Sequence, residues 1–198
     1  MADNTRSLTI KSTGPDPSAL FNSKYNLQVA KSVITNNQLT YNMVWQSHVL
    51  APNMNVEWKP VYGFNWTTCD QGQVFDLDAM GMWEQSTAIP KLRYLKVGKN
   101  NYQTDTGTNG VHFMVGVQEA RDGSSPIFVD PKGMTALYQP QEKVQWWYQS
   151  GMHTSTIIGE NVGPVETGDF TPPDALIGTN SKTSSYNFQA GQWTTTSP

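Results

Sequence analysis

The segment APNMNVEWKP at residues 51–60 has a counterpart, QPQEKVQWWY, at residues 139–148. In both segments a proline is followed four positions later by a valine, and two positions after that by a tryptophan. The matched residues are Pro52, Val56 and Trp58 in the first copy and Pro140, Val144 and Trp146 in the second. This shared spacing predicts an internal repeat, with two related β-halves.

A segment of alternating apolar residues precedes each copy: YNLQVAKSV at residues 25–33 and VHFMVGVQEA at residues 111–120. Short runs rich in β-branched and aromatic residues recur along the chain, and clusters of Gly, Pro and Asn separate them. Such a pattern is typical of strands joined by tight turns. The sequence therefore predicts an all-β fold, specifically an antiparallel β-sandwich. Helical turns are expected at residues 17–21 and 173–177 alone.

We expect one domain over residues 1–198, built from pseudo-halves at about 8–98 and 111–196. The turn-rich stretch at residues 98–110 is the natural joint between them. No long Pro- or Ser-rich linker separates the halves, which favours one body over two independent domains.

The composition excludes several classes of protein. Charged residues make up 15% of the chain, the formal net charge is −3, and Lys and Arg form no run. Binding to nucleic acid relies on clustered Lys and Arg that neutralise phosphates, so we expect no nucleic-acid partner. We expect no transmembrane segment, since no window approaches 18 apolar residues. The N-terminus lacks a signal-peptide pattern and Cys69 is the single cysteine. We therefore expect a cytoplasmic protein, or one exported without a classical signal peptide.

Strand alternation sorts the aromatic residues of the second copy into two faces. Val144, Trp146 and Tyr148 share an apolar face, so Trp58 and Trp146 are predicted to be equivalent core residues. The opposite face carries Gln145, Trp147 and Gln149. At the position of Trp147 the first copy has Lys59.

Trp147 with Gln145 and Gln149 is our first candidate ligand-binding site. An exposed ring flanked by amides suits stacking on a sugar while the amides bond the hydroxyl groups. The alternative is that the other half, a loop or a second subunit covers Trp147. Trp66 and Trp83 are further candidates, because both stand beside glycine at expected strand ends, although a Trp that plugs the end of a sandwich fits equally well.

The polar candidates for catalysis or metal binding are dispersed along the chain. His48, His112 and His153 show no ligand-like spacing, so a zinc site depends on the fold bringing them together. Asp76 and Asp78 share a strand face about 6–7 Å apart, which suits calcium or an acid/base pair, with a solvated face as the alternative. No cofactor motif is present, and we expect no cofactor.

The sequence therefore favours a non-catalytic binding module for carbohydrate, or for a glycolipid or membrane surface, that acts through exposed aromatic residues. One alternative is a small enzyme whose site is assembled from the dispersed His and Asp residues. The other is a structural protein that forms homo-oligomers through its sheet edges.

Overall fold

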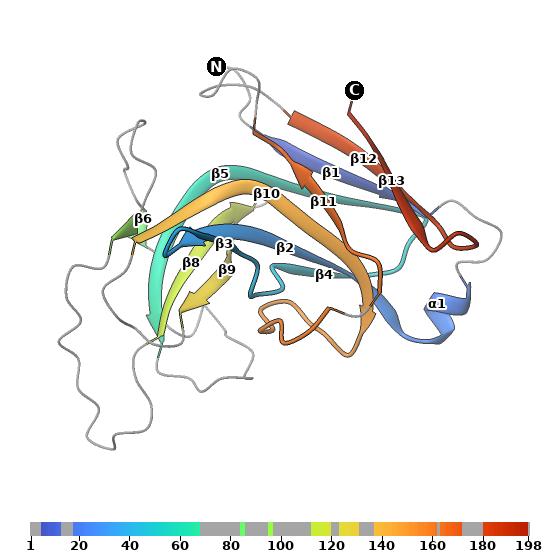
Figure 1. Cartoon of the computed structure of the whole chain (residues 1–198), viewed down its shortest axis with the longest axis horizontal. Helices are drawn as coiled ribbons and strands as arrows, with labels where there is room; N and C mark the ends of the chain where they lie inside the picture. The colour runs from blue at the N-terminus through green and yellow to red at the C-terminus, as the bar shows by residue number, and fades with distance from the viewer. Residues whose placement is uncertain are drawn as a thin grey trace.

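The described strands form two β-sheets in the computed structural model (Figure 1). The structure describes residues 5–12, 18–67, 84–85, 95–96, 112–119, 123–130, 137–161, 163–171 and 180–197. The first sheet, sheet A, has the strand order β13-β12-β1-β5-β8-β9, and β6 pairs with β5. The second sheet, sheet B, has the order β11-β10-β2-β3, with β4 on β2 and β7 on β10.

The bounds of the elements follow from the hydrogen-bonded pairs. Sheet A contains β1 (Arg6–Lys11), β5 (Asn53–Thr67), β6 (Glu84–Gln85), β8 (His112–Glu119), β9 (Gly123–Asp130), β12 (Asn180–Asn187) and β13 (Gln192–Thr196). Sheet B contains β2 (Tyr25–Thr35), β3 (Gln38–Thr40), β4 (Gln46–Val49), β7 (Leu95–Lys96), β10 (Leu137–Ser150) and β11 (Glu166–Asp169). The short helix α1 (Ser18–Asn22) precedes β2.

The all-β prediction is confirmed, and α1 overlaps the first of the two expected helical turns. The strand pairs between described residues are antiparallel with one exception, because β1 runs parallel to β12. The register places Arg6 opposite Asn180 on one side and opposite Trp58 on the other. Sheet A is therefore mixed.

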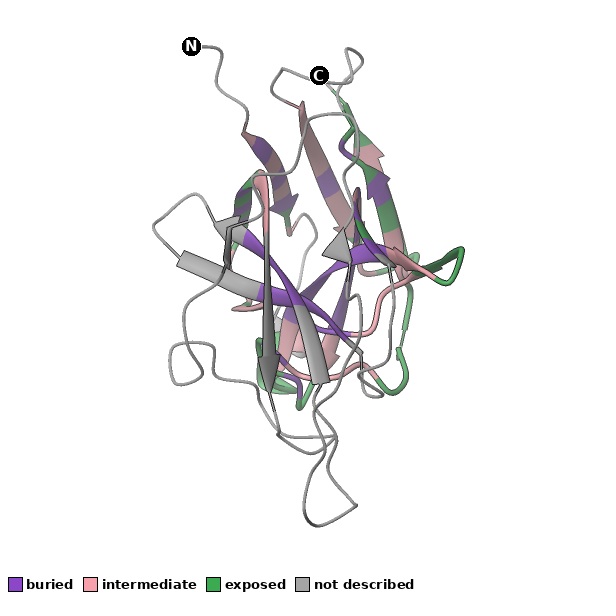
Figure 2. Ribbon diagram, turned by 90° about the vertical axis from the view of Figure 1, so that its left-hand side faces the viewer, coloured by how far each residue is buried: buried purple, intermediate pink, exposed green. Residues whose placement is uncertain are grey.

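Side-chain alternation determines which faces meet. Along β5, Met54, Val56 and Trp58 are buried, whereas the residues between them are exposed. Along β2 every residue from 27 to 33 is buried, so both faces of sheet B are covered at this strand (Figure 2). The inward faces of the two sheets contribute to one hydrophobic core.

Aromatic rings pack closely in this core. The Trp58 ring meets Trp45 edge to face at 5.4 Å between centroids and Phe170 at 5.0 Å. The Trp146 indole nitrogen donates to the Ser184 hydroxyl at 3.2 Å, which joins sheet B to sheet A. At the other edge of sheet A, the amide of Asn42 donates to the Val129 carbonyl and accepts from the Val129 N–H.

The two copies of the repeated segment lie in different sheets. Trp58 is on β5 in sheet A and Trp146 is on β10 in sheet B, and both are fully buried, as predicted. The upstream strand of each copy pairs with the repeated strand of the other: β2 pairs with β10, and β8 pairs with β5. The strands assigned to the two predicted halves are therefore interleaved. No helix among the described residues is long and apolar enough to cross a membrane.

Candidate functional site

Trp147, the first predicted ligand-binding residue, is fully buried, and the expected exposure of its ring is wrong. The ring packs in a small cluster with Ala30, Val44 and Met152, against which Ile158 lies partly buried. The chain that follows β10 therefore covers the outer face of sheet B. The alternative interpretation, in which a loop covers Trp147, describes what the structure shows.

Backbone hydrogen bonds hold this covering segment, residues 151–161, in place. The N–H of Val44 donates to the Thr156 carbonyl at 2.8 Å, and the N–H of Ser155 donates to the Val44 carbonyl at 2.7 Å. The N–H of Ile158 donates to Asn42 at 2.9 Å. These three bonds attach the covering segment to residues 42–44, and the segment keeps water from the apolar face that holds Trp147.

The predicted amide partners of Trp147 serve the protein itself. The Trp147 indole N–H donates to the side-chain oxygen of Gln149 at 2.7 Å, and the Gln149 amide nitrogen lies 3.5 Å from the Glu160 carbonyl. Gln145 is half-buried, with its backbone between β2 and β11. Lys59, at the matching position of the first copy, is exposed. Sheet A is open to solvent at this position, so the copies differ for a packing reason.

The other predicted site residues are not brought together among the described residues. The His48 ring nitrogen Nε2 lies 2.7 Å from the side-chain oxygen of Gln46, and His153 is exposed. His112 begins β8, and its side chain is outside the described part, as is that of Trp66 at the end of β5. Trp83, Asp76, Asp78 and Cys69 lie outside the described residues altogether. Within the described part, no group of three or more His, Cys, Asp or Glu side chains is placed to hold a metal.

A hollow of about 190 Å³ opens where β2 begins and β10 ends. Its lining, named here the tyrosine hollow, consists of Leu20, Tyr25, Tyr148, Gly163, Pro164 and Tyr186. These residues come from α1, β2, β10, the chain before β11, and β12, so both sheets contribute. Tyr148 is buried, whereas Tyr25 and Tyr186 are half-buried and reach solvent.

Stacked rings support the buried side of the hollow. The Tyr148 ring stacks on Trp193 with centroids 5.0 Å apart and an interplanar angle of 28°. It meets Tyr186 edge to face at 5.4 Å, and the Trp193 indole donates to the Pro164 carbonyl at 3.1 Å. These contacts fix the rings before any ligand arrives, which lowers the entropic cost of binding.

The chemistry of the hollow is that of neutral phenols. Burial raises the pKa of Tyr148 and that of Tyr186, so both hydroxyl groups remain protonated at neutral pH. The Tyr148 hydroxyl lies 3.4 Å from the Ser12 hydroxyl. None of the lining residues carries a charge at neutral pH. The hollow is therefore lined by uncharged apolar and phenolic side chains.

Sequence reasoning missed this site because it assigned Tyr148 to the core face. That assignment is correct for burial. The signal that it lacked is spatial: Tyr25 and Tyr148 stand at strand ends, and at such ends a core face opens to solvent. Three tyrosines far apart in the sequence carry no local spacing that predicts their meeting.

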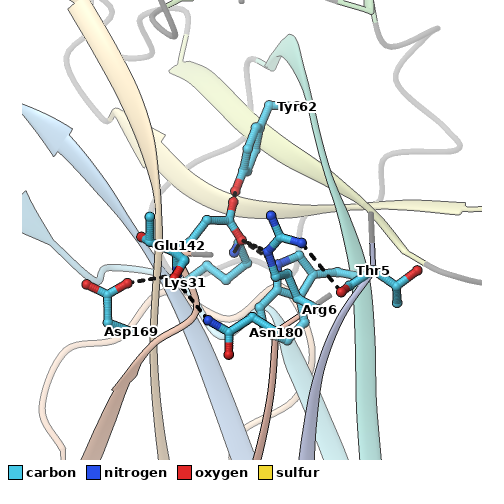
Figure 3. Close-up of polar contacts among 9 residues, drawn as sticks. Thr5, Arg6, Lys31, Tyr62, Glu142, Asp169 and Asn180 are labelled. Carbon is cyan, nitrogen blue, oxygen red and sulfur yellow. Dashed lines mark hydrogen bonds and ion pairs between the residues drawn. The ribbon is translucent and has the colours of Figure 1, made fainter. Parts of the chain in front are cut away.

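A second unexpected feature is a set of three buried charges, named here the charge cluster: Arg6, Lys31 and Glu142 (Figure 3). The Nζ atom of Lys31 lies 3.6 Å from Oε2 of Glu142, and Nε of Arg6 lies 3.9 Å from the same oxygen. Trp58 donates its indole N–H to this oxygen at 2.9 Å, and the Tyr62 hydroxyl donates to the other carboxylate oxygen.

Aromatic rings surround the Lys31 ammonium. Its Nζ atom lies 4.6 Å from the centre of the Trp58 ring, 5.8 Å from that of Trp45 and 5.7 Å from that of Tyr62. Ring faces attract a cation, most strongly where water is excluded. Desolvation by burial nevertheless lowers the pKa of Lys31, although Glu142 opposes this effect.

The pKa of the Glu142 carboxyl group is set by burial and by its neighbours. Burial by itself would raise its pKa, but the nearby Lys31, the hydrogen bonds from Tyr62 and Trp58, and Arg6 outweigh burial. The net effect lowers the pKa of Glu142 below its ordinary value of 4.5. Glu142 is therefore ionised at neutral pH. Glu142 stands two residues after Pro140, and the matching position of the first copy is Met54. No local sequence pattern indicates that a charged residue replaces an apolar one there.

Comparisons with family models, with curated proteins and with solved structures found no match.

Proposed function

We propose that this protein is a non-catalytic binding module for carbohydrate, and that the tyrosine hollow is its binding site. The observation that carries the proposal is the meeting of three tyrosines at one hollow, two of them half-exposed above a buried, stacked third. The predicted class of function is thereby retained. Its predicted location at Trp147 is replaced.

The chemistry of the lining supports a sugar as ligand. A pyranose ring has an apolar face that packs on an aromatic ring, and hydroxyl groups that exchange hydrogen bonds with phenols. Tyr25 and Tyr186, each with a ring and a hydroxyl group, line the same hollow. Because the lining lacks charge, it favours a neutral sugar over a phosphate or a carboxylate.

The size of the hollow narrows the ligand further. Pockets for drug-sized ligands usually hold about 300–1,000 Å³, whereas this hollow holds about 190 Å³. It therefore suits a single ring, such as a terminal sugar residue, with the remainder of a longer glycan on the surface.

Saturation-transfer NMR with a panel of free neutral mono- and disaccharides tests the proposal. The bound sugar should receive magnetisation from the protein, and Tyr186→Ala should weaken its affinity at least about tenfold, the effect of losing one stacking contact and one hydrogen bond. Tyr41→Phe is the matched control, because Tyr41 is a half-buried tyrosine outside the hollow. A sugar that binds wild type and Tyr186→Ala equally would place the site elsewhere, and a blank panel would remove the proposal.

Vesicles distinguish the source of the sugar. A glycolipid partner predicts pelleting with vesicles that display the bound sugar and none with vesicles that lack it. Pelleting with both kinds of vesicle would indicate a membrane surface as the ligand. The alternative functions predict other results: an enzyme would convert the sugar, and a self-associating protein would show a mass above 22.0 kDa by light scattering.

We further propose a cytoplasmic location, or export by a route without a classical signal peptide, on the basis of the single cysteine.

A further inference from the structure

Glu142 connects the two sheets. It belongs to β10 in sheet B, and its carboxylate accepts hydrogen bonds from Trp58 and Tyr62, both on β5 in sheet A. Arg6, on β1 of sheet A, lies within ion-pair distance of the same carboxylate. One buried carboxylate thus accepts hydrogen bonds from β5 and pairs with a cation of β1, two strands of the opposite sheet (Figure 3).

Both ion-pair partners of Glu142 are cations. Lys31 from β2 and Arg6 from β1 both face it, and both are buried. Protonation of Glu142 removes the negative charge next to them. The Lys31 ammonium would then stand in the core beside a neutral acid, and an uncompensated buried charge is strongly destabilising.

The remaining neighbours do not replace that charge. On β5 the titratable neighbour is Tyr62, a neutral donor to the carboxylate. On β11, Asp169 is exposed and accepts from the N–H of Thr171. From β12, Lys182 lies over the Phe170 ring at 5.6 Å and donates to Ser197, and on β10 itself Lys143 is half-buried. Among the described neighbours, cations therefore predominate.

We propose that Glu142 is an acid-sensitive latch between the two sheets. While ionised it holds β1 and β5 of sheet A against β2 and β10 of sheet B. Once protonated it no longer supplies the negative charge that faces Lys31 and Arg6, and the sheets lose their fixed packing while the strands remain paired. The latch does not depend on the proposed carbohydrate site.

The test compares the thermal midpoints of wild type and Glu142→Gln over a pH series. At about pH 7 the variant should melt roughly 6–20 °C lower, because it mimics the protonated state. The difference should shrink towards zero as the pH falls well below the ordinary 4.5 of a glutamate, because wild type then carries the same neutral group. Near-UV circular dichroism should fade in wild type before the far-UV strand signal.

Glu57→Gln is the matched control, because Glu57 is an exposed glutamate on β5. It should follow the wild-type curve at every pH. A difference between wild type and Glu142→Gln that stays constant across the series would overturn the latch.

A wild-type measurement keeps the proposal testable if Glu142→Gln does not fold. The indole N–H of Trp58 donates directly to the Glu142 carboxylate, so its NMR signal, assigned by its loss in Trp58→Phe, should shift on acidification with a midpoint below 4.5. A Trp58 signal that keeps its native position until the far-UV strand signal is lost would show that protonation of Glu142 does not reach the sheet interface, and would refute the latch.

Discussion

The ammonium of Lys31 lies between the Glu142 carboxylate, at 3.6 Å, and the face of the Trp58 ring, at 4.6 Å. The free-energy cost of burying a lysine charge beside one carboxylate is offset by that carboxylate. Removing either member of such a pair costs about 3–5 kcal/mol, whereas replacing both with apolar residues of similar volume is often neutral. The two residues are therefore expected to be strongly coupled energetically.

A double-mutant cycle measures this coupling. We expect Glu142→Leu to lower the free energy of unfolding by about 3–5 kcal/mol, and Lys31→Met/Glu142→Leu to recover at least about 1 kcal/mol of that loss. Urea unfolding of the four proteins gives the interaction energy. Additive losses would show that the pair is not coupled.

The stability that Lys31 contributes should depend on pH in the alkaline range. Its pKa is lower in the folded state than its ordinary 10.5, so between those two values the unfolded chain binds more protons. The stability of wild type relative to Lys31→Met should therefore rise with pH through that window and level off above 10.5. Urea midpoints for both proteins check the sign. A relative stability that falls with rising pH would contradict the lowered pKa.

Trp147 and Lys59 occupy matching positions of the two copies, but their substitution should have very different effects. Trp147→Ala should cost about 3–5 kcal/mol, because it removes a fully buried indole from beneath the covering segment. Lys59→Ala should leave the urea midpoint unchanged, since Lys59 is exposed. Comparable losses in the two variants would mean that the outer faces of the two sheets are equally covered.

Gly168 on β11 is expected to tolerate no side chain. A Cβ there would lie 2.9 Å from the Trp146 ring and 3.1 Å from the Phe170 ring. Both rings are fully buried, so the added methyl group would overpack the core, and Gly168→Ala should cost about 1–3 kcal/mol. Gly159→Ala is the control, because its Cβ would meet nothing within 4 Å. If both variants unfold at the wild-type urea concentration, the packing of Trp146 against β11 is looser than described.

The sequence pattern predicted the features that depend only on residues close together along one strand. Alternation alone identified Trp58 and Trp146 as core residues. The side-chain period of a strand is two, so in each copy the tryptophan lies on the same apolar face as the valine two positions before it. It also identified the all-β class and one helical turn. These features need no knowledge of which strands pair.

The features that depend on distant segments were not predictable in this way. Trp147 is buried because residues 151–161 return over it, and glutamine neighbours give no sign of that cover. Lys31 continues the inward series of Leu27 and Val29, which places a charge in the core. Its partner Glu142 is far away in the sequence, so nothing local shows that the charge is compensated.

The parallel pairing of β1 with β12 has a consequence for synthesis on the ribosome. Arg6 must meet Asn180, so one side of β1 stays unpaired until β12 has been made. Pairing with β5 is available much earlier and leaves that side as a free edge. A free edge recruits other strands and promotes aggregation. We therefore expect that shortening the chain before β12 yields insoluble protein, and that a chaperone masking β1 during translation raises the yield of soluble chain that includes β12.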